Sequence, residues 1–216
     1  DTTRLKALDQ FACDGYLYVK PDSAFYFAQL EYDFAKSRGL KKQMSTALNT
    51  QGVSYYVKSN YPKAKELYQK CLAIDEELGN KKGIARALLN IGNIYSDEGN
   101  YPKALEHYQK SLTIRKEIGD KKGIANPLLY IGIIYSDQGN YPKALEYFQK
   151  SLAIDEELGN KQGISSALNS IGLIYSDNSN YPEALEYFQK SQAVDEELGS
   201  KEGIASSLHN IGMIYH

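Results

Sequence analysis

The sequence is poor in the residues and charges that mark several classes of protein. Its 216 residues include two cysteines, three histidines and no tryptophan, and the formal net charge is −2. Two cysteines, Cys13 and Cys71, are too few for a disulfide framework and lack the spacing of metal ligands. A near-neutral chain also lacks the clustered excess of lysine and arginine that binds phosphate backbones, so we expect no nucleic acid as its main partner.

Long apolar runs and catalytic motifs are missing as well. No run approaches the roughly 18 apolar residues of a membrane span, so we expect no direct membrane insertion. The sequence contains no HExxH, no GxSxG and no phosphate-binding glycine loop. We therefore expect a protein that is not an enzyme and that uses neither a cofactor nor a metal. Because the chain opens on Asp1 rather than methionine, we also expect a processed or excised piece.

What the sequence has in abundance is repetition with a fixed period of 40 residues. The segments that begin at residues 59, 99, 139 and 179 read "SNYPKAKELYQKCL", "GNYPKALEHYQKSL", "GNYPKALEYFQKSL" and "SNYPEALEYFQKSQ". Such self-similarity is typical of repeat arrays, and we predict a single array over residues 1–216. Its units are a diverged repeat at 1–40, regular repeats at 41–80, 81–120, 121–160 and 161–200, and the first helix of an incomplete repeat at 201–216.

Each unit predicts a pair of helices. The apolar residues between Ile84 and Tyr95 share one helical face, and those between Ala104 and Leu112 share another. Between these segments, glycine and asparagine suit the left-handed end of a first helix, and Pro102 suits the first turn of a second helix. Five pairs and one further helix predict an all-α solenoid of antiparallel helix pairs with about 11 helices.

Carboxylates cluster near the ends of the predicted second helices. The run "DEELG" occurs at 75–79, 155–159 and 195–199, and lysines follow each copy. Acidic residues at a helix C-terminus oppose the helix dipole, so capping does not explain them. We interpret these runs as solvated salt bridges between repeats, each of which contributes little to stability.

The repeat pattern resembles the tetratricopeptide repeat (TPR) family. In one unit the matching residues are Leu88, Ile91, Gly92, Tyr95, Ala104 and Tyr108. Leucine stands where the family often has tryptophan, and the 40-residue period resembles the long-repeat class of kinesin light chains. The opening segment is similar to TPR sensor regions of bacterial signalling proteins with cyclase, histidine kinase or DNA-binding outputs. The resemblance implies a right-handed superhelix whose concave groove, lined by first helices, binds protein or peptide.

The copies differ at outward-facing positions of the first helices. Apolar residues, asparagines that can bond a peptide backbone and a row of aspartates occupy these positions, which favours a peptide of some basic character. The candidate groove residues are Asn49, Val53, Leu89, Asn93, Asp97, Leu129, Ile133, Asp137, Asn169, Leu173, Asp177, His209 and Met213. The alternative is that the long helices bury part of this face against the next repeat.

Two local features lead to separate expectations. Pro127 stands where the other first helices have alanine or serine, so we expect a shifted helix start or a bend near residues 123–127. At the end of the chain an apolar face has no second helix to cover it, so we expect either a continuation beyond residue 216 or a homodimer. The residues of this face are Leu208, Ile211, Ile214 and Tyr215.

Taken together, these observations favour a non-enzymatic protein- or peptide-binding scaffold, as the sensory or interaction part of a larger signalling protein. One alternative is a regulatory or dimerisation domain of an attached enzyme, such as a cyclase or a kinase, without an external ligand of its own. Another alternative is a structural spacer.

Overall fold

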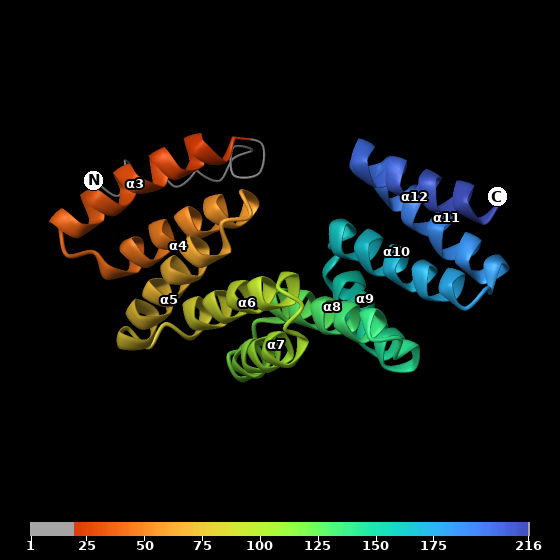
Figure 1. Cartoon of the computed structure of the whole chain (residues 1–216), viewed down its shortest axis with the longest axis horizontal. Coiled ribbons are helices and arrows are strands. Elements are labelled where there is room, and N and C mark those ends of the chain that lie inside the picture. Colours follow the sequence, from red (N-terminus) through yellow and green to blue (C-terminus); the bar gives the residue numbers. More distant parts are fainter. Residues whose placement is uncertain (1–19, 216) are drawn as a thin grey trace. The chain divides into compact units, whose positions relative to one another are not determined.

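The computed structural model describes residues 20–215, and this part of the chain contains ten α-helices and no strands (Figure 1). The helices are α3 (Pro21–Ser37), α4 (Lys41–Val57), α5 (Tyr61–Glu77), α6 (Lys81–Asp97), α7 (Tyr101–Glu117), α8 (Lys121–Asp137), α9 (Tyr141–Leu158), α10 (Lys161–Asp177), α11 (Tyr181–Leu198) and α12 (Lys201–Ile214). The predicted all-α fold of helix pairs is confirmed. The first helix of the diverged repeat, and Cys13 with it, lies outside the described residues.

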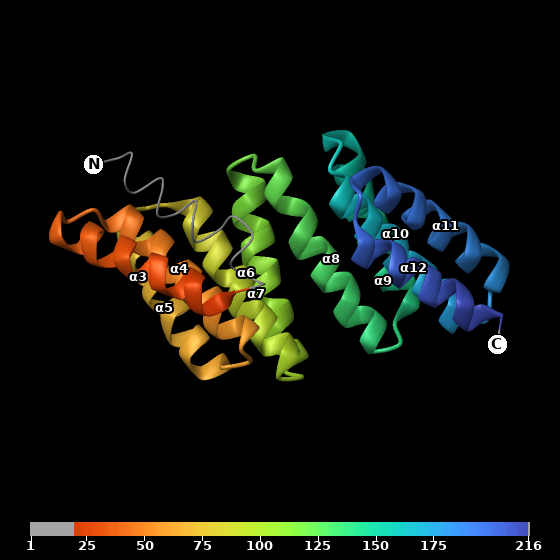
Figure 2. The ribbon, with the colours of Figure 1, turned by 90° about the horizontal axis from the view of Figure 1, so that it is seen from above.

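The chain divides into two compact units, Asp1–Ile114 and Arg115–His216. Consecutive helices pack against each other, from α3 to α6 in the first unit and from α8 to α12 in the second (Figure 1, Figure 2). The even-numbered helices are the first helices of the repeats. They also touch one another, α4 with α6 in the first unit, and α8 with α10 and α10 with α12 in the second. First helices therefore form a layer of their own in each unit.

The repeated segment explains where the second helices begin. Asn60 and Asn140 precede the Tyr-Pro pairs, and their side chains accept hydrogen bonds from the backbone N–H groups of Lys63 and Lys143 at 3.3 and 3.4 Å. These bonds are N-caps, which satisfy a donor that the first turn would otherwise leave free. The proline that follows has no N–H to lose at this position.

The core of each unit is built where the aromatic ring of a second helix packs on a glycine of the preceding first helix. A Cβ atom on Gly172 would lie 2.7 Å from Cε1 of Phe188, and one on Gly52 would lie 2.5 Å from Cε1 of Tyr68. Both rings are buried. Glycine is therefore required at these positions, because any side chain would force the helices of the pair apart.

The predicted shift of the helix start near Pro127 is wrong. Helix α8 begins at Lys121, in register with the other first helices, and Pro127 lies buried inside it. Proline has no N–H to donate to the carbonyl one turn earlier. The first turn of α8 is tight, since the N–H groups of Gly123 and Ile124 both bond the carbonyl of Asp120, at 2.9 and 3.2 Å. A bend at this proline stays a prediction.

Candidate functional site

Asparagines of the predicted groove are partly engaged in bonds between first helices. In the first unit, Nδ2 of Asn90 donates to Oδ1 of Asn49 at 2.9 Å, which links α6 to α4. In the second unit, Nδ2 of Asn210 donates to Oδ1 of Asn169 at 2.8 Å, which links α12 to α10. An asparagine side chain has two donor hydrogens and an oxygen with two lone pairs, so one bond leaves capacity for a ligand.

The apolar candidates divide between packed and exposed positions. Leu89 lies in the core, while Leu129 and Ile133 pack in part against a core cluster of the second unit. Leu173 on α10 and Met213 on α12 are instead 41% and 64% exposed. The part of the predicted face that is open to a partner therefore lies at the end of the second unit.

In the first unit the remaining candidates have partners within the fold. Val53 packs against the core cluster of α5 and α6. The carboxamide oxygen of Asn93 accepts a hydrogen bond from the Tyr108 hydroxyl at 2.8 Å. Asp97 is exposed and bonds the hydroxyl of Tyr56, and burial of this tyrosine together with the neighbouring carboxylate raises its pKa far above the ordinary value.

The remaining candidates of the second unit are polar and exposed. Asp137 and Asp177 are exposed at the ends of α8 and α10, and His209 is exposed on α12. Asp177 lies one turn after Leu173 on α10, so an exposed apolar side chain and a carboxylate share one face of that helix. A surface of this kind suits a peptide with an apolar anchor and a basic neighbour.

The carboxylate runs are only partly the solvated salt bridges that the sequence predicted. The glutamates are exposed, and ion pairs between repeats are present, for example Lys161 with Glu197 at 2.8 Å. The prediction is wrong for the aspartate of each run, because Asp75, Asp155 and Asp195 are buried. The missed signal is their spacing, since each aspartate continues the buried stripe of its second helix.

In two repeats this buried carboxylate accepts a hydrogen bond from the asparagine that precedes the next first helix. Nδ2 of Asn80 donates to Oδ1 of Asp75, and Nδ2 of Asn160 donates to Oδ1 of Asp155, each at 2.7 Å. Burial raises the pKa of Asp155, and its bonds from Asn160 and Ser151 oppose this shift. The group therefore ties the end of a second helix to the start of the next first helix.

A third repeat achieves the same link with the charges exchanged. Arg115 replaces the aspartate and Asp120 replaces the asparagine. Nη1 of Arg115 donates to Oδ2 of Asp120 at 2.8 Å, and both side chains are largely buried. A Cβ atom on Gly123 would lie 1.8 Å from this Nη1, so the guanidinium occupies the space against that glycine. The site thus accepts a guanidinium–carboxylate pair.

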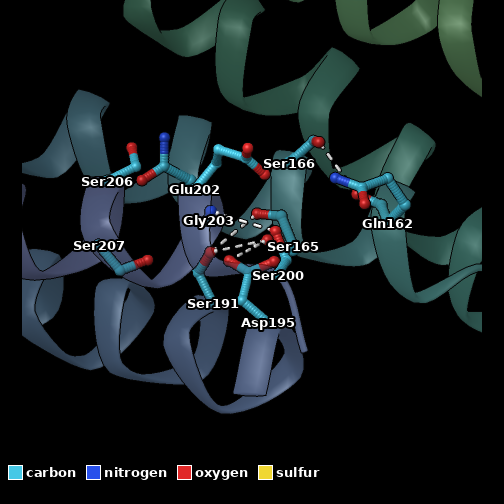
Figure 3. A pocket seen from close by; sticks show the side chains of 11 residues that line it. Gln162, Ser165, Ser166, Ser191, Asp195, Ser200, Glu202, Gly203, Ser206 and Ser207 are labelled. Carbon is cyan, nitrogen blue, oxygen red and sulfur yellow. Dashed lines mark hydrogen bonds between the residues drawn. The ribbon is translucent and has the colours of Figure 1, made fainter. Parts of the chain in front are cut away.

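In the repeat at 161–200 this link is incomplete, and a pocket is present there (Figure 3). Ser200 replaces the asparagine, and its hydroxyl accepts from the N–H of Gly203 at 3.2 Å instead of reaching Asp195. Oδ2 of Asp195 accepts from Ser165 at 2.7 Å, while its Oδ1 is buried without a partner among the described residues. The pocket has a volume of about 280 Å³ and lies between α10, α11 and α12.

The predicted self-association face is uncovered in the described part of the chain. Leu208 and Tyr215 are exposed, while Ile211 and Ile214 are half-buried. A Cβ atom on Gly212 would meet nothing within 4 Å in residues 20–215, in contrast to the glycines that pack on aromatic rings. The face therefore has the surface of a first helix that lacks its second helix.

The described residues offer neither a cluster of metal ligands nor a membrane span. No group of three or more histidine, cysteine, aspartate or glutamate side chains could hold a metal ion there. Within residues 20–215, every helix is too short or too polar to cross a membrane. Cys71 is a buried free thiol that contacts Ser45, and burial raises its pKa.

Comparisons with solved structures place the fold. It is similar to BtubC (BKLC) from P. vanneervenii, at 17% identity and a TM-score of 0.77, over 91% of this chain and 83% of that one. It is similar to aspartyl phosphate phosphatase F from Bacillus subtilis, at 19% identity and a TM-score of 0.76, over 87% of this chain and 49% of that one. A signal transduction ATPase with numerous domains (STAND) and a TPR sensor, from Pyrococcus horikoshii, matches at 20% identity and a TM-score of 0.67, over 98% of this chain and 35% of that one.

Sequence comparison identifies the family. No curated protein sequence matches the chain. The tetratricopeptide repeat family matches residues 43–117, 83–157 and 163–216, which together make up most of the chain. Similarity to the solved structures agrees with this match at the level of the fold. The chain therefore belongs to the tetratricopeptide repeat family.

Proposed function

We propose that this chain is a non-enzymatic scaffold that binds protein or peptide segments along the outward-facing surface of its first helices. TPR proteins bind protein or peptide partners, and the TPR fold is generally a non-catalytic scaffold. The observation that carries the proposal is the exposure of Leu173 and Met213 beside the carboxylate of Asp177. Exposed apolar side chains rimmed by polar ones mark interaction sites.

The exposed residues do not contribute to the core of the second unit. That core is formed by Ala144, Phe148, Ile171 and Ile174, which are all buried. Leu173 lies between two of these isoleucines in the sequence but points to the opposite side of α10. The exposed part of the Leu173 side chain therefore does not contribute to the core. A partner that covers it gains apolar contact area.

The partner in this proposal is a peptide segment with an apolar anchor and a basic residue. The apolar side chain would cover Leu173 and Met213, and the basic residue would face Asp177. The larger context in the proposal is a signalling protein whose sensory or interaction part is a single array over residues 1–216. Support comes from the TPR sensor of the similar STAND protein, although the chain covers 35% of that protein's length.

Selection from a random peptide display library tests the proposal. Peptides selected on the 216-residue chain are expected to be enriched in sequences with an aromatic or aliphatic residue next to lysine or arginine. Fluorescence anisotropy should then show at least tenfold weaker binding to the Leu173→Glu, Met213→Glu double variant. The matched control is Leu158→Glu, which changes a residue on α9 that is also 41% exposed. Equal binding by both variants would contradict the proposal.

The uncovered face of α12 favours a second candidate, a regulatory domain that dimerises. Leu208 is 52% exposed, whereas its counterpart Leu168 in α10 is 7% exposed. A second copy could cover this face through the same residues on both chains. Sedimentation velocity of the chain at increasing concentration tests this candidate. A dimer that dissociates in the Leu208→Glu variant is expected, and a monomer at all concentrations would contradict it.

A further inference from the structure

The pocket between α10, α11 and α12 differs from the equivalent positions of the other repeats in its side chains. Ser200 stands where two repeats have asparagine, Ser206 stands where another has Arg86, and Ser207 stands where three repeats have alanine. Each replacement is smaller or more polar than its counterpart. Ser200 and Ser206 are therefore shorter than Asn160 and Arg86 at the equivalent positions, and Ser207 adds a hydroxyl.

Two buried polar atoms in this pocket lack partners. Oδ1 of Asp195 and Oγ of Ser207 have no hydrogen-bond partner among residues 20–215, and each of the two residues is only 1% exposed. A buried polar group without a partner is costly, and native proteins rarely retain one without a reason. Figure 3 shows Asp195, Ser165, Ser191 and Ser200 gathered at one side of the pocket, with Ser207 on α12 nearby.

The charges of the residues that line the pocket indicate which kind of ligand it would bind. Among the described lining residues there are two carboxylates, Asp195 and Glu202, and neither lysine nor arginine. Most of the others are serines, whose hydroxyls can accept hydrogen bonds as well as donate them. A cation that carries several N–H donors fits this set, because it meets the free carboxylate oxygen with a charge-assisted hydrogen bond.

Other repeats already place a guanidinium group at the equivalent position. Arg115 occupies the aspartate position itself and pairs with Asp120 in the third repeat. In the first unit, Arg86 occupies the position of Ser206, and its charge partly opposes the rise that burial causes in the pKa of Cys71, the counterpart of Ser191. The framework therefore accommodates an arginine head group in two repeats, and the last repeat offers the space and the carboxylate without the arginine.

We propose that the pocket binds the guanidinium or ammonium head of an organic cation, with Asp195 as the charged acceptor and serine hydroxyls as further acceptors. The head group comes either from a free small amine or from an arginine or lysine side chain of a peptide. A volume of about 280 Å³ holds such a head group with part of its stem. It is many times the roughly 30 Å³ of one water molecule, so a single water does not fill it. The pocket is separate from Leu173 and Met213, and the inference stands without the proposed peptide face.

Titration of the 216-residue chain with defined probes tests the inference. The probes are methylguanidinium, N-acetyl-arginine methylamide and N-acetyl-lysine methylamide, and the neutral control is N-acetyl-citrulline methylamide. The expected result is saturable shifts of the Ser191, Asp195 and Gly203 amide signals in ¹H–¹⁵N NMR spectra with the cations and none with citrulline. Methylguanidinium binding as tight as the arginine probe indicates a free amine, and binding of the arginine or lysine probes alone indicates a peptide side chain.

Two variants separate binding from folding. Asp195→Asn keeps the shape of the side chain and removes its charge, so binding should weaken at least tenfold. Ser200→Asn restores the donor that the other repeats have, so it should abolish binding while raising the Tm by a few degrees. Asp155→Asn, at the equivalent position of the preceding repeat, is the control and should leave binding unchanged. No saturable shift with any cation, an equal response to citrulline, or unchanged binding in Ser200→Asn would overturn the inference.

Discussion

The first helices α10 and α12 of the second unit have matching sequences but different surroundings. Gly172 in α10 packs on the ring of Phe188, while Gly212 in α12 faces open space within residues 20–215. Asn160, which precedes α10, donates to Asp155, while Ser200, which precedes α12, leaves a carboxylate oxygen of its aspartate unpaired. Repeated residues of α10 therefore pack against neighbouring helices, whereas the equivalent residues of α12 face open space or leave a neighbour unpaired within residues 20–215.

The largest expected difference in stability is between two variants that each lack one of the equivalent carboxylates, Asp155 and Asp195. Asp155→Ala leaves the amide of Asn160 without its acceptor, so we expect a loss of about 3 kcal/mol in the free energy of unfolding. Asp195→Ala removes a carboxylate whose Oδ1 has no partner among residues 20–215, and should cost about 1 kcal/mol. Urea unfolding followed by circular dichroism measures both. Equal costs would contradict the view that Asp195 is incompletely paired.

Alanine at the two equivalent glycines should have effects of opposite sign. Gly172→Ala places a methyl group against Phe188 and should destabilise the protein by about 2 kcal/mol. Gly212→Ala meets no neighbour and replaces a poor helix former, so it should stabilise the protein by about 0.8 kcal/mol. Thermal unfolding of both variants provides the measurement. Destabilisation by Gly212→Ala would show that another segment or a second copy covers α12 in solution.

The buried carboxylate of α9 should also make stability depend on pH. Because burial raises the pKa of Asp155 in the folded state, the native state binds this proton more tightly than the unfolded state does. The stabilising contribution is therefore complete below the unfolded pKa and is lost as pH rises through the folded pKa. The difference in unfolding free energy between the native chain and Asp155→Asn should fall over this range. A difference that grows with pH would show that the bonds from Asn160 and Ser151 outweigh burial.

The smallest expected effect concerns the loops that precede the second helices. Two repeats have glycine in left-handed conformation at the end of the first helix, Gly99 with φ of 71° and Gly139 with φ of 71°. Ser59 and Ser179 hold φ of 57° at the equivalent positions. Ser179→Gly should therefore stabilise the second unit by about 0.5 kcal/mol, after the larger chain entropy of glycine is subtracted. Differential scanning calorimetry can detect the increase in Tm.

The architecture could be predicted from the sequence because the 40-residue period repeats the same helix signals. Asparagine before Tyr-Pro marks the start of the second helices α5, α7, α9 and α11, and a small residue in left-handed conformation follows most helices. The prediction for the start of α8 is wrong because Pro127 lies inside the helix, which begins at Lys121 in register with the other first helices. The 40-residue register of the repeats therefore predicts where α8 begins better than the position of the proline does.

The candidate site could be predicted only in part, because its key residues look like surface charges. Asp195 stands in an acidic run, yet it follows Ala184, Phe188 and Ser191 at helical spacing and so lies on the buried side of α11. The loss of its donor at Ser200 becomes visible only when the contacts of the other repeats are known. The exposure of Leu173 also depends on neighbours that the repeat pattern alone does not specify.

The most direct test of the account is the dissociation constant of a library-selected peptide for two matched variants of the 216-residue chain. Leu173→Glu places a charge on the proposed binding face, and Leu158→Glu places the same charge at an equally exposed position on α9. We expect at least tenfold weaker binding for Leu173→Glu and a change within twofold for Leu158→Glu. Equal affinities, or a greater loss in Leu158→Glu, would contradict the claim that partners bind on the first helices.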